Sequence, residues 1–218
     1  MATPYLQLRR DTVASTQDIA RAALDDLPVL VLAADQTEGR GRDGREWVSA
    51  DRALAASFAF RVNELDARPF SLMAGVAAVR ATEGATLKWP NDVLVDSSKV
   101  GGILVERSGS VVVVGMGLNL WWVTTPEGMS GLFEEDPGID RYAGVGGLWG
   151  AELMSLVDGE GWPIGEYRES CGTLGQEIRW EPDGEGVAVD IAADGALVVM
   201  VDGERMPIRS GEVHHVRG

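Results

Sequence analysis

The order of apolar and polar positions predicts alternating strands and helices over the first three quarters of the chain. Residues 29–34 form a short apolar run that predicts a buried strand, and residues 53–62 have the same character. A helix is expected after Ser15, because this N-cap residue precedes the helix-forming segment 19–24. A second helix is expected from Pro69 to about Glu83, where proline opens an alanine-rich stretch.

From Thr86 onward the pattern predicts short strands joined by turns. Residues 86–95 indicate strand, turn and strand, and residues 102–106 and 110–115 predict two further strands around a turn at 107–109. Residues 121–140 are loop-like, and helices are expected at 141–157 and 163–171.

After Thr173 the pattern changes to short alternating segments, which are typical of β-hairpins. The segments are 177–180, 186–191, 196–201, 205–208 and 213–216, and the turns between them include Asp183-Gly184, Asp194-Gly195 and Asp202-Gly203. This pattern predicts a small β-barrel of about 45 residues at the end of the chain.

Composition narrows the class of protein. A chain of 218 residues with 45% hydrophobic positions can bury a real core. The net charge of −15 argues against a general nucleic-acid coating role, which needs a basic face. No apolar run is long enough to span a membrane, no secretory signal is read, and the single cysteine, Cys171, allows no internal disulfide. A cytoplasmic location is therefore expected.

A glycine- and arginine-rich loop at residues 39–47 is the first segment with candidate chemistry. Its Gly-x-Gly-x-x-Gly spacing is not interpreted as a dinucleotide fingerprint, because no helix pattern or acidic residue follows as required. An ordinary solvated loop is an alternative. We favour an anion-binding loop, in which backbone N–H groups and Arg40, Arg42 and Arg45 surround phosphate or carboxylate oxygens. Such a loop is expected to become ordered when filled.

Three further segments carry polar residues next to predicted strands. In residues 88–92, the turn at Pro90 places Asn91 and Asp92 at a strand edge. Residues 99–106 open a strand with a lysine and two glycines. Residues 115–120 include Asn119 in an apolar setting. Each alone is also explained by an ordinary turn or a bulge. Of the 19 basic residues, the two lysines, Lys88 and Lys99, both fall here.

Together with Ser15 and Thr16, these segments resemble the catalytic domains of biotin–protein ligases. The resemblance runs from about Ser15 to Asn119 and resumes near Tyr167, continuing to Arg217, while residues 121–165 are not aligned. It implies an α+β fold, with a mixed sheet and helices on one face in residues 1–170 and an SH3-like barrel in residues 171–218. It also implies an ATP- and Mg²⁺-dependent enzyme that forms biotinoyl-AMP and transfers biotin to a lysine of a biotin carboxyl carrier domain.

The resemblance also implies roles for individual residues. Those expected to bind biotin are Ser15, Thr16, Gln36, Gly39, Arg40, Lys99, Gly101, Gly102 and Gly115. Those expected to bind ATP or the adenylate are Arg42, Arg45, Trp47, Asn91, Lys99, Gly117 and Asn119. Lys99 would bridge carboxylate and α-phosphate, Arg40 would lie near the carboxylate, and Asp92 is the candidate to accept a proton from the incoming lysine. No metal ligand is assigned.

Departures from the family pattern are Gln17, where asparagine is common, Asp43 within the anion loop, and Trp121. Only fourteen residues precede Ser15, so no DNA-binding domain is expected there. The acidic net charge and the lack of a long apolar run also predict no nucleic-acid and no membrane partner. A monomer and a homodimer are both open. Two alternative functions remain: a lipoate–protein ligase, and a biotin-binding sensor without catalysis.

Overall fold

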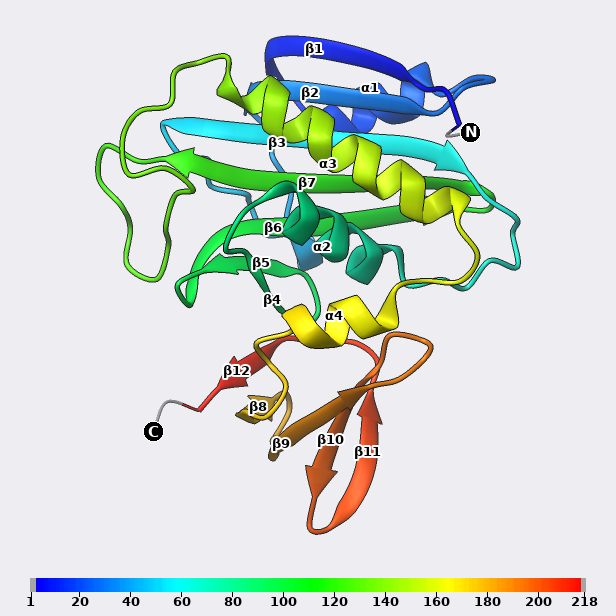
Figure 1. Cartoon of the computed structure of the whole chain (residues 1–218), viewed down its shortest axis with the longest axis vertical. Coiled ribbons are helices and arrows are strands. Elements are labelled where there is room, and N and C mark those ends of the chain that lie inside the picture. Colours follow the sequence, from blue (N-terminus) through cyan, green and yellow to red (C-terminus); the bar gives the residue numbers. More distant parts are fainter. Residues whose placement is uncertain (1–2, 217–218) are drawn as a thin grey trace.

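A seven-stranded mixed sheet forms the main layer of the protein (Figure 1). The computed structural model describes residues 3–216, so Arg217, at the end of the resembling segment, lies outside it. The strands are β1 (Leu6–Val13), β2 (Val29–Gln36), β3 (Arg52–Arg61), β4 (Thr86–Lys88), β5 (Asp92–Val95), β6 (Ser98–Ser108) and β7 (Val111–Trp121). They lie in the order β1-β2-β3-β7-β6-β5-β4. β1 runs parallel to β2, whereas the other neighbouring pairs are antiparallel.

Two features of this sheet differ from the sequence prediction. β1 was not predicted, because it is a largely exposed edge strand whose charged residues form no apolar run. β6 and β7 are also longer than expected. The glycines of residues 101–102 and 115–117 therefore lie within paired strands and not at strand ends.

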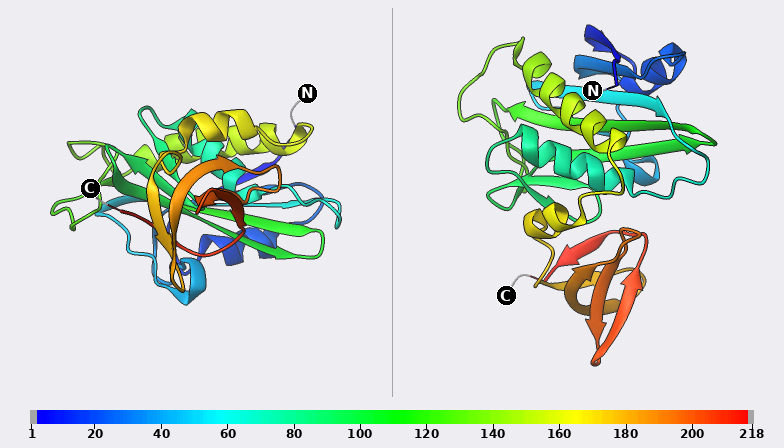
Figure 2. Two further views of the ribbon diagram at one scale, coloured as in Figure 1. Left: turned by 90° about the horizontal axis from the view of Figure 1, so that it is seen from below. Right: turned by 45° about the vertical axis from the view of Figure 1, so that its right-hand side comes forward.

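The helices cover both faces of the sheet, so the expectation of helices on one face is wrong. They are α1 (Thr16–Ala23), α2 (Phe70–Ala81), α3 (Arg141–Asp158) and α4 (Ile164–Ser170). α1 packs through Ala20 against Val31, whereas Leu30 belongs to the larger core under α2 and α3. Successive residues of a strand point to opposite faces. The left view of Figure 2 shows α1 and α3 on opposite sides of the sheet.

Glycines let α3 approach the sheet closely. A Cβ atom at Gly146 would lie 2.6 Å from a methyl carbon of Leu32, and one at Gly150 would lie 2.4 Å from a methyl carbon of Leu30. These residues lower the helix propensity of the segment. Burial against the sheet compensates for this low propensity, since Trp149 and Leu153 of the same helix are fully buried.

The last part of the chain folds as a five-stranded antiparallel sheet. Its strands are β8 (Glu177–Trp180), β9 (Gly184–Ile191), β10 (Leu197–Val201), β11 (Glu204–Ile208) and β12 (Val213–His215), in the order β11-β10-β9-β8-β12. The predicted strand positions are confirmed, and Asp202 and Gly203 adopt positive φ angles of 50° and 85° in the tight turn after β10. Within residues 3–216 the pairings give an open order of strands, so closure into a barrel stays a prediction.

Trp89 joins the two parts of the chain. Its indole is 2% exposed, and Nε1 donates a hydrogen bond of 3.0 Å to the carbonyl oxygen of Gly195. Its backbone N–H donates to Oγ1 of Thr173, also at 3.0 Å. The segment that ends in Asn91 and Asp92 is thus fixed by the C-terminal sheet.

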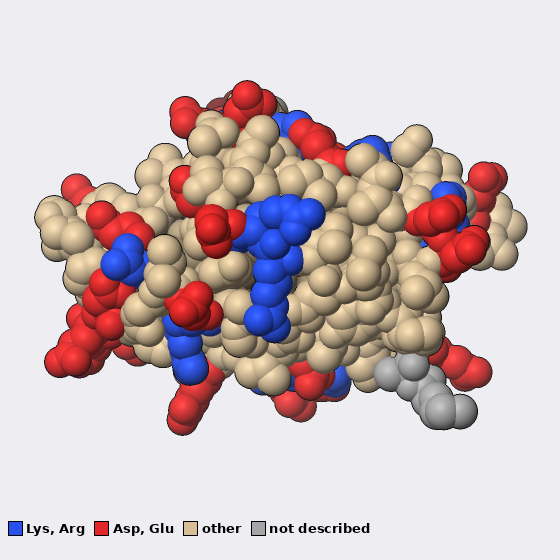
Figure 3. All heavy atoms as spheres, turned by 90° about the horizontal axis from the view of Figure 1, so that it is seen from above, with Lys and Arg blue, Asp and Glu red and all other residues tan. Residues whose placement is uncertain are grey.

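The surface is predominantly acidic. Figure 3, which views the molecule from the β1 end, shows carboxylates scattered over this face around a basic strip near its middle. Of the helices within residues 3–216, none has the length and apolar character needed to cross a bilayer.

Candidate functional site

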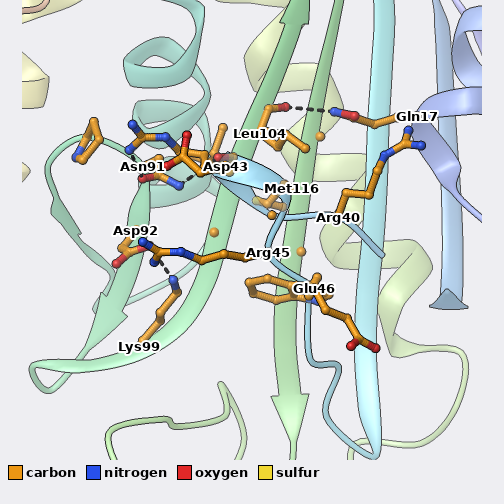
Figure 4. Close-up of a pocket in the computed structure, with 18 of the residues that line it drawn as sticks. Gln17, Arg40, Asp43, Arg45, Glu46, Asn91, Asp92, Lys99, Leu104 and Met116 are labelled. Atoms are coloured by element: carbon orange, nitrogen blue, oxygen red, sulfur yellow. Dashed lines mark hydrogen bonds and ion pairs between the residues drawn. The ribbon is translucent and has the colours of Figure 1, made fainter. Parts of the chain in front are cut away.

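Most of the predicted site residues line one cleft, with a volume of about 150 Å³. It lies over β6 and β7, between the start of α1, the loop 39–47 and residues 88–92, and ten of its lining residues are labelled in Figure 4. The predicted residues that line it are Ser15, Thr16, Gln36, Arg40, Arg42, Arg45, Trp47, Asn91, Asp92, Lys99, Gly102, Gly115 and Gly117. Segments up to one hundred residues apart in the sequence therefore converge as predicted.

Three predicted residues lie outside this lining. A Cβ atom at Gly101 would lie 2.7 Å from a methyl carbon of Leu118, so Gly101 serves packing within the sheet. Gly39 is buried, and its carbonyl oxygen accepts a hydrogen bond from the N–H of Trp47. Asn119 is also buried; its Oδ1 accepts from the N–H of Ala50, and its Nδ2 has no partner among the described residues.

One end of the cleft is built from neutral hydrogen-bonding groups. The backbone N–H and the hydroxyl of Thr16 lie 2.7 Å and 2.8 Å from Oε1 of Gln36. Oγ of Ser57, on β3, lies 2.8 Å from Oγ1 of Thr16. Ser15 occupies the N-cap position of α1, but its side chain does not cap the helix. Its Oγ instead accepts a hydrogen bond from Arg40 at 3.3 Å.

Gln17 fills the space above Gly115. A Cβ atom at Gly115 would lie 2.9 Å from Nε2 of Gln17, and this nitrogen donates a hydrogen bond of 3.1 Å to the carbonyl oxygen of Leu104. Oε1 of Gln17 is buried without a partner among the described residues. The absence of a side chain at Gly115 thus leaves room for Gln17, which is one of the departures from the family pattern.

The other end of the cleft is built from charged groups. Nζ of Lys99 lies 2.6 Å from Oδ1 of Asp92. Arg42 donates to Oδ1 of Asn91 at 3.1 Å and to the carbonyl oxygen of Gly211 at 3.3 Å. Figure 4 shows Lys99 and Asp92 pointing toward one another, across the cleft from Arg40.

A residue of the C-terminal sheet region completes this charged end. Glu212 forms an ion pair with Arg45, and hydrogen bonding to Arg45 lowers the pKa of the Glu212 carboxyl. The same interaction raises the pKa of the Arg45 guanidinium. Sequence reasoning assigned no role to Glu212, although it did note the end of the chain as similar to the family.

Trp47 lies against the backbone of β6 and β7 because both strands have glycine at the contact. A Cβ atom at Gly117 would lie 2.4 Å from Cε2 of the indole, and one at Gly102 would lie 3.1 Å from Cζ3. Nζ of Lys99 is 6.0 Å from the centroid of the same ring. The two glycines therefore permit a flat aromatic surface beside the lysine.

Arg40 contacts α1 and not the charged end. Its guanidinium lies 2.7 Å from Asp18 and 3.8 Å from Glu106, and Glu106 also pairs with Arg21. Hydrogen bonding to Arg40 lowers the pKa of the Asp18 carboxyl. In this arrangement Arg40 ties the loop 39–47 to α1.

The charge of the cleft differs from that of the whole chain. Its lining includes the cations Arg40, Arg42, Arg45, Lys88 and Lys99 and the carboxylates Asp43, Glu46, Asp92 and Glu212. The lining is therefore nearly neutral, although the chain carries a net charge of −15. A site of this kind can balance the negative charge of ligands that the rest of the surface repels.

No three His, Cys, Asp or Glu side chains within residues 3–216 are placed to bind a metal ion. At this end of the cleft Asp92 lies beside Lys99, Glu212 pairs with Arg45, and Oδ1 of Asn91 accepts a hydrogen bond from Arg42. Magnesium in nucleotide sites keeps several waters and binds one or two carboxylates plus phosphate oxygens. The residues present are compatible with that mode of binding.

Comparisons with known proteins identify the family of the chain. Residues 12–120 match the model of the biotin/lipoate A/B protein ligase family. The biotin–[acetyl-CoA-carboxylase] ligase of Mycobacterium tuberculosis is 34% identical over 91% of this chain and 84% of its own length. The enzyme of the same name from Paracoccus denitrificans is 42% identical over 41% of this chain and 43% of its own.

A solved structure resembles the whole fold. The biotin protein ligase from Aquifex aeolicus in complex with biotin and ATP superposes with a TM-score of 0.81 and 26% identity, covering 98% of this chain and 99% of that one. The family match includes the loop 39–47, the segment 88–92 and Lys99. The chain therefore belongs to the biotin/lipoate A/B protein ligase family.

Proposed function

We propose that this protein is a biotin–protein ligase, which activates biotin with ATP and transfers it to a lysine of a biotin carboxyl carrier domain. One observation carries the proposal: a single cleft joins a neutral hydrogen-bonding end, around Thr16 and Gln36, to a charged end with Lys99 and two arginines. The first suits a polar, uncharged ring, and the second suits a carboxylate next to a phosphate. Relatives named for this activity, and a similar structure that holds biotin and ATP, support the assignment.

In the first step, a carboxylate oxygen of biotin attacks the α-phosphorus of ATP, and the bond to pyrophosphate breaks. The two reacting groups are both anionic, so fixed cations must hold them together. Lys99 suits this role because a compact ammonium fits between two oxygens where a guanidinium does not. Arg42 and Arg45 bind the adenylate in this scheme, and Trp47 offers a flat surface beside it. Asp92 would hold a Mg²⁺ ion that accompanies ATP, and the ion would supply screening of the phosphate charges.

In the second step, the amine of the carrier lysine attacks the acyl carbon, the acyl–oxygen bond breaks and AMP leaves. The amine loses a proton, and Asp92 is the candidate to accept it. Asp92 lies 2.6 Å from Nζ of Lys99. The proposed proton acceptor and the proposed bridging cation are thus neighbours in the fold.

We further infer a division into a catalytic domain, residues 1–170, and an SH3-like barrel, residues 171–218. The antiparallel sheet that begins at β8 and the hydrogen bonds of Trp89 across the joint support this division. A requirement for ATP favours a cytoplasmic location.

The test is biotin transfer to a purified carrier domain, with and without MgATP. We expect biotin-dependent pyrophosphate release from the chain alone and ATP-dependent labelling of the carrier. Pyrophosphate release with lipoate but not with biotin would assign the chain to the lipoate branch of the family. Binding of biotin with neither release nor transfer would identify a sensor.

A further inference from the structure

The hydroxyl of Ser57 is buried beside the neutral end of the cleft, in contact with Thr16. Ser57 lies on β3 between apolar neighbours and is 0% exposed. Its only side-chain contact of hydrogen-bonding length among the described residues is Oγ1 of Thr16, at 2.8 Å. A hydroxyl pair leaves the direction of the hydrogen bond open. Here the neighbouring groups decide it.

The direction follows from the backbone N–H of Thr16, which can only donate. It lies 2.7 Å from Oε1 of Gln36, so that atom is the amide oxygen of Gln36. The hydroxyl of Thr16 lies 2.8 Å from the same oxygen and must also donate to it. The single proton of this hydroxyl is then used, so Ser57 must donate to Thr16. The chain of bonds runs from Ser57 through Thr16 to Gln36.

This fixed direction determines what Gln36 offers to a ligand. Both lone pairs of its amide oxygen are occupied by Thr16, and its Nε2 donates to no group among the described residues while the side chain lines the cleft. The neutral end of the cleft therefore presents an amide N–H donor in a single orientation. A cyclic urea carries a carbonyl acceptor for such a donor, whereas a dithiolane ring has no comparable acceptor.

We propose that Ser57 is a positioning residue, which holds Thr16 and through it the Gln36 amide so that the cleft selects a ring with a carbonyl acceptor. The inference rests on the proposed function and identifies which part of the site recognises the urea ring of biotin. In this arrangement both Thr16 donors are directed to Gln36. Thr16 therefore orients Gln36, and Gln36 supplies the donor.

The test is a double-mutant cycle with Ser57→Ala and Thr16→Val, which removes the Thr16 hydroxyl at nearly constant shape. Ser57→Ala should raise KM for biotin about tenfold, because a buried acceptor on Thr16 loses its donor. KM for ATP and kcat should stay within about twofold of the parent. Thr16→Val should raise KM for biotin at least as much, and adding Ser57→Ala to it should change KM by less than about twofold.

Matched variants separate positioning from general damage. Ser155→Ala, at an exposed position of α3, should match the parent. Ser57→Cys keeps a weak donor of similar size and should give an intermediate KM for biotin, which also covers a failure of Ser57→Ala to fold. Thermal unfolding of each variant identifies any loss of structure.

An unchanged KM for biotin in Ser57→Ala or, should that variant not fold, in Ser57→Cys would overturn the inference. Effects of Ser57→Ala and Thr16→Val that multiply in the double variant would also overturn it, as would equal losses toward biotin and ATP. An inactive parent chain would instead refute the proposed function, since the inference concerns only differences from an active parent.

Discussion

The two ends of the cleft hold their side chains by different kinds of interaction. At the neutral end, Thr16 and Ser57 are buried, and hydrogen bonds of 2.7–2.8 Å join Thr16 to Ser57 and to Gln36. At the charged end, Arg45 is exposed and Glu212 is partly buried, and their ion pair joins two segments far apart in the sequence. Buried hydrogen bonds are costly to break, whereas exposed ion pairs contribute little stability.

This difference suits the role that we propose for each end. A ring that stays unchanged in both steps is best bound by a preformed, rigid surface. Phosphate groups arrive, react and leave, so the cations that bind them must exchange one partner for another. Lys99, Arg42 and Arg45 each contact a polar side chain of the protein, and in the proposed reaction a substrate oxygen takes the place of that partner.

The largest effect is expected from Lys99→Ala, which removes the cation between the two reacting groups. Biotin-dependent pyrophosphate release should fall by at least about a hundredfold, the usual loss when one preorganised charge-stabilising group is removed. Lys99→Arg should also be strongly impaired, because the planar guanidinium is larger than an ammonium. Release at the parent rate in Lys99→Ala would show that the charged end is not the reaction centre.

A smaller effect is expected from Gly117→Ala, because the added methyl group would occupy the place of the Trp47 indole. Displacing Trp47 should raise KM for ATP by roughly tenfold and leave KM for biotin nearly unchanged. Gly147→Ala is the matched control, since a Cβ atom there meets nothing within 4 Å. That variant should keep parent kinetics and gain up to about 1 kcal/mol of stability in α3. Equal KM values for ATP in both variants would contradict a nucleotide role for Trp47.

Glu212→Gln should have a modest effect, since it removes a partly buried partner of Arg45. Without substrates, trypsin should cleave the loop 39–47 a few times faster than in the parent, while biotin with ATP should still protect the loop. Glu185→Gln removes an exposed ion pair to Arg179, away from the cleft, and should leave cleavage unchanged. Equal cleavage of the parent with and without substrates would refute ordering of the loop.

The smallest effect concerns pH. Burial, followed by the charge of Lys88, lowers the pKa of His215, whose Nε2 lies 3.2 Å from Oγ1 of Thr173. The unfolded chain therefore binds this proton more readily than the folded protein. The contribution of His215 is complete above an unfolded-state pKa of about 6.5 and decreases as the pH falls through the lower folded value.

The thermal unfolding midpoint should accordingly fall slightly between pH 8 and pH 5.5, and His215→Gln should reduce this fall. His214→Gln, at the exposed neighbouring position, should retain it. Identical pH profiles for His215→Gln and the parent would show that His215 does not contribute.

The sequence predicted residues at both ends of the cleft and missed one at each, Ser57 at the neutral end and Glu212 at the charged end. Arginines in a glycine-rich loop and a lysine before two glycines are local patterns, so Arg42, Arg45 and Lys99 could be selected without knowledge of the fold. Ser57 stands alone in an alanine- and phenylalanine-rich strand, and only the packing of β3 against α1 gives it a partner. A polar residue in an apolar strand was the available signal.

The errors in the fold have a similar origin. Helix periodicity identifies α1 but not the face of the sheet on which it lies. That face depends on the handedness of the β1–α1–β2 connection and on the register of β1 with β2. The side-chain partner of Arg40 could not be predicted either, because the loop pattern does not show where α1 lies. Its partner Asp18 lies on α1, whose position decides where the guanidinium points.

Through its hydrogen bonds to Trp89, the C-terminal part of the chain supports the segment that carries Asn91 and Asp92. A chain cut at residue 170 would expose an indole that is now 2% accessible and would remove its acceptor at Gly195. Asn91 and Asp92 follow two and three residues later and would lose their anchorage. The small terminal sheet is thus a poor candidate for deletion or for exchange between relatives, even though few of its side chains line the cleft.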